Sequence, residues 1–221
     1  MNLQAILQTI SIAAIPMLFA ITLHEVAHGL AARFFGDRTA EAQGRLSLNP
    51  LKHVDPIGTV LVPGALLLLG APFLFGWARP VPVNARYFRR PRVDMAWVAA
   101  AGPAANLAMA IAWAVLGAAA AAGYAGGGAA GSWLAQMARV GVYFNVLLAV
   151  FNMLPIPPLD GGRVLVGVLP PGPAHALARV EPYGFLIVLA VVSIPGLFGT
   201  LLGPGVRLLM NLMNSIARLV S

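Results

Sequence analysis

The N-terminal apolar run is the feature that most constrains this chain, because it places ionisable residues inside a segment long enough to cross a membrane. Residues 1–23 contain no charged side chain, and the segment stays largely apolar to about Phe35. About 20 apolar residues are enough to span a bilayer as a helix. The sequence HEVAH lies within this run, at residues 24–28. We therefore expect a membrane helix, kinked at Pro16, that carries two histidines and a glutamate.

The composition indicates that the whole chain belongs in a membrane. Of the 221 residues, 59% are hydrophobic and 10% are charged, whereas a soluble domain carries about 25% charged residues. We expect a single membrane domain over residues 1–221. The net charge of +7 comes from basic residues between apolar runs, where the positive-inside rule places them, so we expect no nucleic-acid binding. The chain has no cysteine, which excludes disulfides and thiolate metal ligands.

Several further apolar segments follow the first one. They cover residues 57–77, 94–122, 133–154, 183–203 and 205–220. The last could be a membrane span or a helix lying in the interface. Arg45-Leu46-Ser47-Leu48 alternates like a short strand. The sequence thus predicts an all-α polytopic membrane protein with about four to six membrane segments and a small β element or re-entrant hairpin between the first two main helices.

The arginines bear on the path of segment 57–77. Arginines follow the first helix, and a second cluster occupies residues 79–92. The positive-inside rule puts both groups on the cytoplasmic side, which a single crossing by 57–77 would not allow. A re-entrant hairpin is one interpretation, and an ordinary span with one loop that violates the rule is the other. If the segment is a hairpin, the span before Asp160 returns to the cytoplasmic side, at a depth similar to that of HEVAH.

The HEVAH motif is typical of a metal site. His24 and His28 are four residues apart, so both imidazoles project from one face of a helix and can bind one ion. Glu25 lies beside the open position of that metal, where it could take a proton from bound water and pass it to a leaving amine. Zinc suits such ligands. The alternative is a polar cluster that only helps helices pack, but charged groups near mid-bilayer cost about 2.5–3.5 kcal/mol each.

Asp160 is the strongest candidate for a third ligand, since catalytic zinc usually has three protein ligands. It follows an apolar span and a proline-rich stretch, and the two glycines after it allow a close approach of the backbone. The alternative is that Asp160 caps a helix over 161–169. His53, His175 and the remaining acidic residues are further candidates, and the role of His53 stays open.

These motifs resemble the site-2 protease family of intramembrane zinc metalloproteases. The resemblance rests on HEVAH and on an NxxPxPxLDG pattern from Asn152 to Gly161, with less specific support from residues 45–50 and 101–106. It covers roughly residues 24–165, and the chain is similar to the minimal members of the family, without the PDZ or CBS domains of many relatives.

The resemblance implies roles for individual residues. It implies that His24, His28 and Asp160 bind one Zn²⁺, that Glu25 is the general base and that Asn152 lines the substrate cleft. A substrate held there must be extended, so the strand-like pieces near 45–48 and 79–84 are candidates to hold it. The alternative for 79–84 is a plain proline-rich loop.

The resemblance also implies a zinc-dependent endopeptidase that hydrolyses peptide bonds in or near transmembrane segments of membrane proteins. Its partners would be those substrates and the lipid bilayer, with a homo-oligomer or a regulatory membrane partner left open. We expect a multi-pass protein of a prokaryotic cell membrane, with the active site towards the cytoplasm. The competing hypotheses are a membrane metal transporter or sensor, whose polar ligands should lead to both faces, and an inactive scaffold, which should have lost Glu25.

Overall fold

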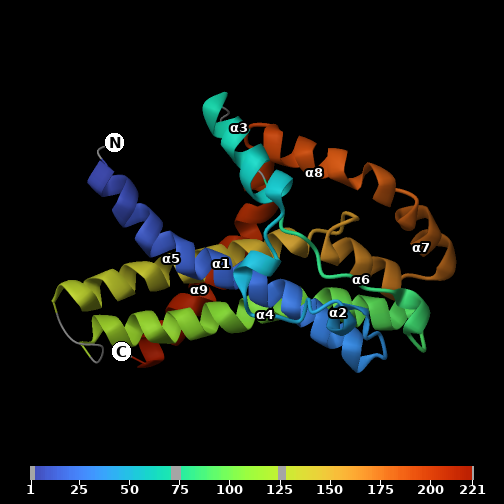
Figure 1. Ribbon diagram of the computed structural model, residues 1–221, viewed down its shortest axis with the longest axis horizontal. Helices are drawn as coiled ribbons and strands as arrows, with labels where there is room; N and C mark the ends of the chain where they lie inside the picture. Colours follow the sequence, from blue (N-terminus) through green and yellow to red (C-terminus); the bar gives the residue numbers. More distant parts are fainter. Residues whose placement is uncertain (1–2, 71–75, 124–127, 221) are drawn as a thin grey trace.

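The chain folds into a bundle of helices, seen here in a computed structural model that describes residues 3–70, 76–123 and 128–220. Three long helices form its centre (Figure 1), namely α1 (Leu3–Phe34), α4 (Pro91–Ala121) and α5 (Ala129–Asn152). The shorter α-helices are α2 (Thr39–Ala42), α3 (Val62–Leu68), α6 (Asp160–Val168), α7 (Pro171–Ala178) and α8 (Gly184–Ser193), and α9 (Leu197–Val220) ends the fold. Three short 3₁₀-helices, η1 (Pro50–Lys52), η3 (Ala85–Tyr87) and η4 (Glu181–Tyr183), and one π-helix, η2 (Pro56–Leu61), complete the described part of the fold.

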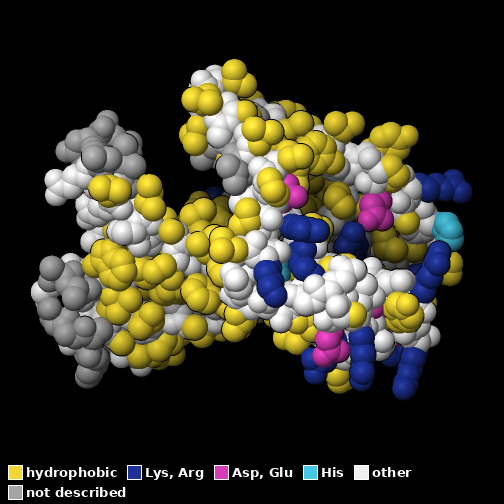
Figure 2. Space-filling view, viewed as in Figure 1, with side chains coloured by type: hydrophobic (Ala, Val, Ile, Leu, Met, Phe, Trp, Pro, Cys, Tyr) yellow, Lys and Arg dark blue, Asp and Glu magenta, His cyan; other side chains and the backbone are white. Residues whose placement is uncertain are grey.

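The predicted class, an all-α polytopic membrane protein, is confirmed. The described part of the chain contains no strand, and four of its helical segments are long and apolar enough to cross a membrane. These are Leu7–Phe34, Pro91–Ala121, Gly131–Asn152 and Pro171–Ser193. Apolar side chains cover much of the outer surface (Figure 2), as a lipid-facing surface requires.

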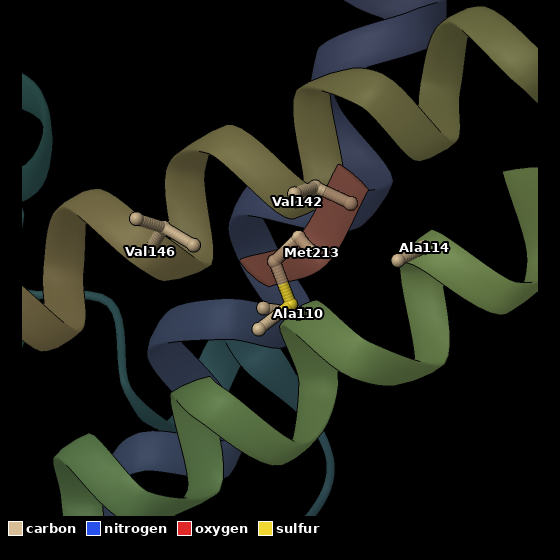
Figure 3. Packing of buried hydrophobic residues seen from close by; sticks show 5 residues of the cluster. All are labelled: Ala110, Ala114, Val142, Val146 and Met213. Carbon is tan, nitrogen blue, oxygen red and sulfur yellow. The ribbon is translucent and has the colours of Figure 1, made fainter. Parts of the chain in front are cut away.

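Small residues bring the central helices close together. Ala110 and Ala114 of α4 pack against Val142 and Val146 of α5, and Met213 of α9 fills the space between them (Figure 3). Helices in a membrane gain stability mainly from close packing, since lipid is as apolar as the side chains. The tight α4–α5 contact gives the site described below a firm support.

The segment 57–77 returns to the place where it begins. The Trp77 N–H donates to the Gly58 carbonyl at 3.1 Å, and the Thr59 hydroxyl donates to the Trp77 carbonyl at 2.8 Å. A Cβ on Gly58 would lie 2.4 Å from the Trp77 ring, so only glycine allows this contact. The segment is therefore a hairpin rather than a single crossing; the part of it at residues 71–75 lies outside the described residues.

The structure corrects two predictions about single elements. Residues 45–48 are irregular rather than a strand, because no other strand lies beside them in the described chain to pair with. The span over 183–203 is also wrong, since α8 ends at Ser193 and α9 begins at Leu197. Pro195 keeps Ile194 extended, and Gly196 then turns the chain with a φ of +81°. The candidate span combines α7, η4 and α8 instead.

Candidate metal centre

Three predicted metal ligands come together at one point of the bundle. The Nε2 atoms of His24 and His28, one turn apart on α1, are 3.0 Å from each other. Asp160 Oδ2 lies 3.2 Å from the first and 3.4 Å from the second. A tetrahedral zinc ion with bonds of about 2.0–2.1 Å sets its ligands about 3.3 Å apart. This is the only such group of three His, Asp or Glu residues in the described part of the chain.

The protons of this group point away from its centre. The Nδ1 atom of His28 lies 2.7 Å from the Val98 carbonyl, which can only accept, so Nδ1 donates and Nε2 keeps a lone pair. Nδ1 of His24 donates in the same way to Asn106 Oδ1, at 2.6 Å. Asp160 Oδ2 is buried without a hydrogen-bond donor. Three lone pairs therefore face one another in a buried space, and a cation is the group that would stabilise them.

Asp160 is the first residue of α6, but its side chain does not cap that helix. The N-cap is Leu159, without a side-chain cap hydrogen bond, so the capping alternative is wrong. The two glycines after Asp160 let the chain fold back tightly: a Cβ on Gly161 would lie 2.2 Å from the Met153 carbonyl oxygen, and one on Gly162 would lie 2.3 Å from the Pro157 nitrogen. Next to this close packing, the Asp160 carboxylate faces the two imidazoles of α1.

A chain of buried amides supports His24 from behind. Asn106 of α4 donates from Nδ2 to the Ala20 carbonyl at 3.1 Å and to Asn145 Oδ1 of α5 at 2.9 Å. Asn145 in turn donates to the Gly141 carbonyl at 2.8 Å. Both asparagines are fully buried. Hydrogen bonds of this kind fix the tautomer and orientation of a metal-binding histidine.

Gly102 lets α4 pass directly beside the two imidazoles. A Cβ at this position would lie 2.4 Å from His28 Nε2 and 2.6 Å from His24 Cε1. Any other residue would therefore move an imidazole or the helix.

Glu25 is half-buried beside this group and accepts a hydrogen bond from the backbone rather than from another side chain. Its Oε2 atom accepts from the Val81 N–H at 2.8 Å. Val81 belongs to segment 79–84, which forms a proline-rich loop without regular secondary structure rather than a strand, and Arg45 donates to the Arg79 carbonyl of this segment. Burial, together with repulsion from Arg79, lowers the pKa of Arg45, and the nearby Glu25 carboxylate offsets this only in part.

The other predicted residues are not part of the group formed by His24, His28 and Asp160. Asn152 is half-buried at the end of α5 and donates to the Leu148 carbonyl of its own helix at 3.0 Å, so its role in binding substrate stays a prediction. His53 is buried in the loop after α2, with Nε2 2.9 Å from the Ser47 carbonyl oxygen. His175 is exposed on α7.

Asn106 and Asn145 are site residues that the sequence analysis did not identify as such. An asparagine inside an alanine-rich membrane helix is costly unless it is paired, and this cost is the signal that could have singled them out. Residues 101–106 entered the sequence analysis only through a resemblance.

Similarity to known proteins shows the class of enzyme to which this chain belongs. YwhC of Bacillus subtilis is 41% identical over 182 residues, which cover 82% of this chain and 80% of YwhC. Rip2 of Mycolicibacterium smegmatis is 34% identical over 180 residues, covering 81% and 66%. Rip2 of Mycobacterium tuberculosis (strain H37Rv) is 30% identical over 186 residues, covering 84% and 68%. All three relatives are named as zinc metalloproteases. The chain is thus a zinc metalloendopeptidase with several membrane segments.

The family follows from the same comparisons. The model of peptidase family M50 matches residues 121–192, and the relatives above extend the match over most of the chain. This chain belongs to peptidase family M50, the site-2 protease family. Membership implies membrane-protein substrates and a lipid environment. No solved structure gave a significant match.

Proposed function

We propose that this protein cleaves peptide bonds in or near transmembrane segments of other membrane proteins. In this proposal His24, His28 and Asp160 hold the zinc, and Glu25 is the general base. The observation that carries it is the meeting of His24 and His28, on an apolar helix of membrane-spanning length, with Asp160 of α6; the three ligand atoms lie 3.0–3.4 Å apart. Residues 1–221 act as one domain in this account.

The chemistry divides between the metal and the chain. Bound zinc would polarise the scissile carbonyl and lower the pKa of its water. Glu25 accepts the proton of the attacking water and donates it to the leaving amine. Asn106 and the Val98 carbonyl keep the two imidazoles in the tautomer that turns Nε2 to the metal.

The segment 79–84 is our candidate for holding the substrate. A transmembrane helix must lose local hydrogen bonds before its backbone can be cut, and an extended edge can replace them. Within the described residues, no hydrogen bond engages the Val81 and Pro82 carbonyls or the Val83 N–H. Because the Val81 N–H contacts Glu25, a peptide paired to this edge would lie beside the base. We propose that Asn152 also contacts the substrate.

The basic residues support an orientation. Figure 2 shows Lys and Arg side chains gathered over the half of the molecule that carries α2 and α6, while the opposite half is mostly apolar. A concentration of Lys and Arg on one side of a membrane protein marks its cytoplasmic side. We propose a prokaryotic cell membrane as the location, with the active site towards the cytoplasm.

The test is cleavage of a candidate single-span membrane protein by the purified enzyme and by its Glu25→Gln variant. We expect Glu25→Gln to bind zinc normally and to lose about 10²–10⁴-fold in rate, the usual contribution of a general base. Glu41→Gln is the matched control, since Glu41 is exposed and its carboxylate pairs with the exposed Arg33. Cleavage by Glu25→Gln at the wild-type rate would refute the proposed mechanism.

A further inference from the structure

A buried arginine outside the metal group holds the segment that contacts Glu25. Arg45 donates from Nη2 to the carbonyl oxygens of Arg79, at 2.8 Å, and of Pro80, at 3.3 Å. The next N–H along the chain is that of Val81, because Pro80 has none, and it donates to Glu25 Oε2 at 2.8 Å. We call residues 79–84 the strap. Arg45 and Glu25 thus bind neighbouring backbone groups of the strap.

A second buried charge holds the other end of the strap. Asp37 Oδ2 accepts the Asn84 N–H at 2.6 Å, and Asp37 Oδ1 accepts the Thr39 N–H at 2.9 Å. Asp37 is fully buried. Pro82, between the two anchors, fixes its own φ. Both ends of the strap are therefore fixed, and its middle is stiff.

The strap lies directly on α1 beside the metal ligands. Gly29 follows His28, and a Cβ on Gly29 would lie 3.0 Å from Val81 Cγ1 and 2.4 Å from Leu46 Cδ2. Leu46 is the neighbour of Arg45 in the chain. The loop that carries Arg45 and the strap that it holds are thus seated on the same turn of the helix that bears the HEVAH motif.

The burial of Arg45 needs a reason, because its charge is not neutralised by a direct partner. Only 8% of Arg45 is exposed, and its Nε has no hydrogen-bond partner. Within the described residues it makes no ion pair. Burying a charge without such a pair is costly. The two hydrogen bonds that Arg45 donates to carbonyl oxygens are the interactions that offset this cost.

We propose that Arg45 is a positioning residue of the peptidase reaction. By holding the carbonyls of Arg79 and Pro80, it keeps the Val81 N–H against Glu25 and so fixes the orientation of the Glu25 carboxylate. This inference rests on the role proposed above for Glu25. A displacement of about 1 Å in a reacting group can cost about 100-fold in rate, so loosening the strap should slow the chemical step and leave the zinc in place.

The experiment compares Arg45→Gln and Arg45→Lys with Arg33→Gln, an exposed arginine paired with Glu41. Three measurements are made on the full chain: the single-turnover cleavage rate at saturating enzyme, the zinc content, and hydrogen exchange of a peptide covering the strap. We expect Arg45→Gln to cleave about 10–100-fold more slowly, with full zinc content and faster exchange in the strap. Arg45→Lys should recover part of the rate, because a lysine can still donate to one carbonyl. Arg33→Gln should stay within about twofold of wild type.

Each other outcome counts against the proposal. A wild-type single-turnover rate in Arg45→Gln would overturn it, and so would a rate loss without faster exchange in the strap. Loss of zinc, or failure of both Arg45 variants to fold, would show that Arg45 supports the structure rather than the base. The Glu25→Gln variant separates a failure of the proposed function from a failure of the positioning role of Arg45. If that variant cleaves normally, the proposed function fails; if it is inactive while Arg45→Gln is normal, only the positioning role fails.

Discussion

The two halves of the proposed site, the metal ligands and the general base, are built in different ways. The metal half stands on regular helices: His24 and His28 share a face of α1, and Asp160 begins α6. Asn106, from α4, supports it through a hydrogen bond to the His24 ring. The base half depends on the irregular strap, which buried charged side chains hold in place.

This difference shows how the functional groups of each half are held in position. A helix fixes side-chain positions through its own hydrogen bonds, so the metal half needs only neutral amides and a glycine beside it. An irregular segment lacks such bonds, and its backbone must be held from outside. Variants of the two halves should therefore fail differently: changes in the metal half should release zinc, and changes in the base half should slow cleavage while zinc stays bound.

Gly102→Ala should give the largest effect on the metal half. The added Cβ would lie 2.4 Å from His28 Nε2, so an imidazole or α4 must move. We expect zinc affinity to fall by at least about 100-fold, the upper end of the range for residues that support ligands. Competition with a fluorescent chelator measures this. Gly117→Ala, which tightens the contact of α4 with Ala138 instead, should keep its zinc; equal losses in both variants would contradict a local cause.

Asn106→Leu should weaken zinc binding by about 10–100-fold. The substitution removes the acceptor for His24 Nδ1 and leaves the Ala20 carbonyl and Asn145 without their partner. The same competition titration applies, with Asn211→Leu on the exposed side of α9 as the control. Unchanged zinc affinity in Asn106→Leu would mean that the amide chain serves only helix packing.

Gly29→Ala should give the smallest effect, and in the base half alone. Its Cβ would press on Val81 and on the flexible end of Leu46, shifting the strap by a few tenths of an ångström. We expect a loss of a few-fold in single-turnover rate, on the order of 1 kcal/mol in the barrier, with zinc affinity unchanged. Released zinc would show that the halves are not separable here.

The sequence could indicate that His24, His28 and Asp160 lie near one another, because the relation between the two histidines is local. The spacing of His24 and His28 places both on one helix face whatever surrounds them, and the charge pattern put Asp160 at a similar depth. The contacts now seen between these three residues confirm that they meet.

The base half could not be predicted, because it depends on contacts between distant segments. Arg45 is 34 residues from Arg79 and Asp37 is 47 from Asn84, and no periodicity connects them. The same limit explains the error at 45–48, where alternation resembled a strand without a partner. The error at 183–203 differs in kind: hydropathy weighed the apolar residues there but not the break at Pro195 and Gly196.

The identity of the zinc ligands is the central claim, and X-ray absorption at the zinc edge tests it most directly. The wild-type protein should hold about one zinc per chain, with only nitrogen and oxygen neighbours at about 2.0–2.2 Å, two of them imidazoles. Asp160→Ala should lose most of this zinc, and what remains should lack one oxygen neighbour. Full zinc content and an unchanged spectrum in Asp160→Ala would contradict the account.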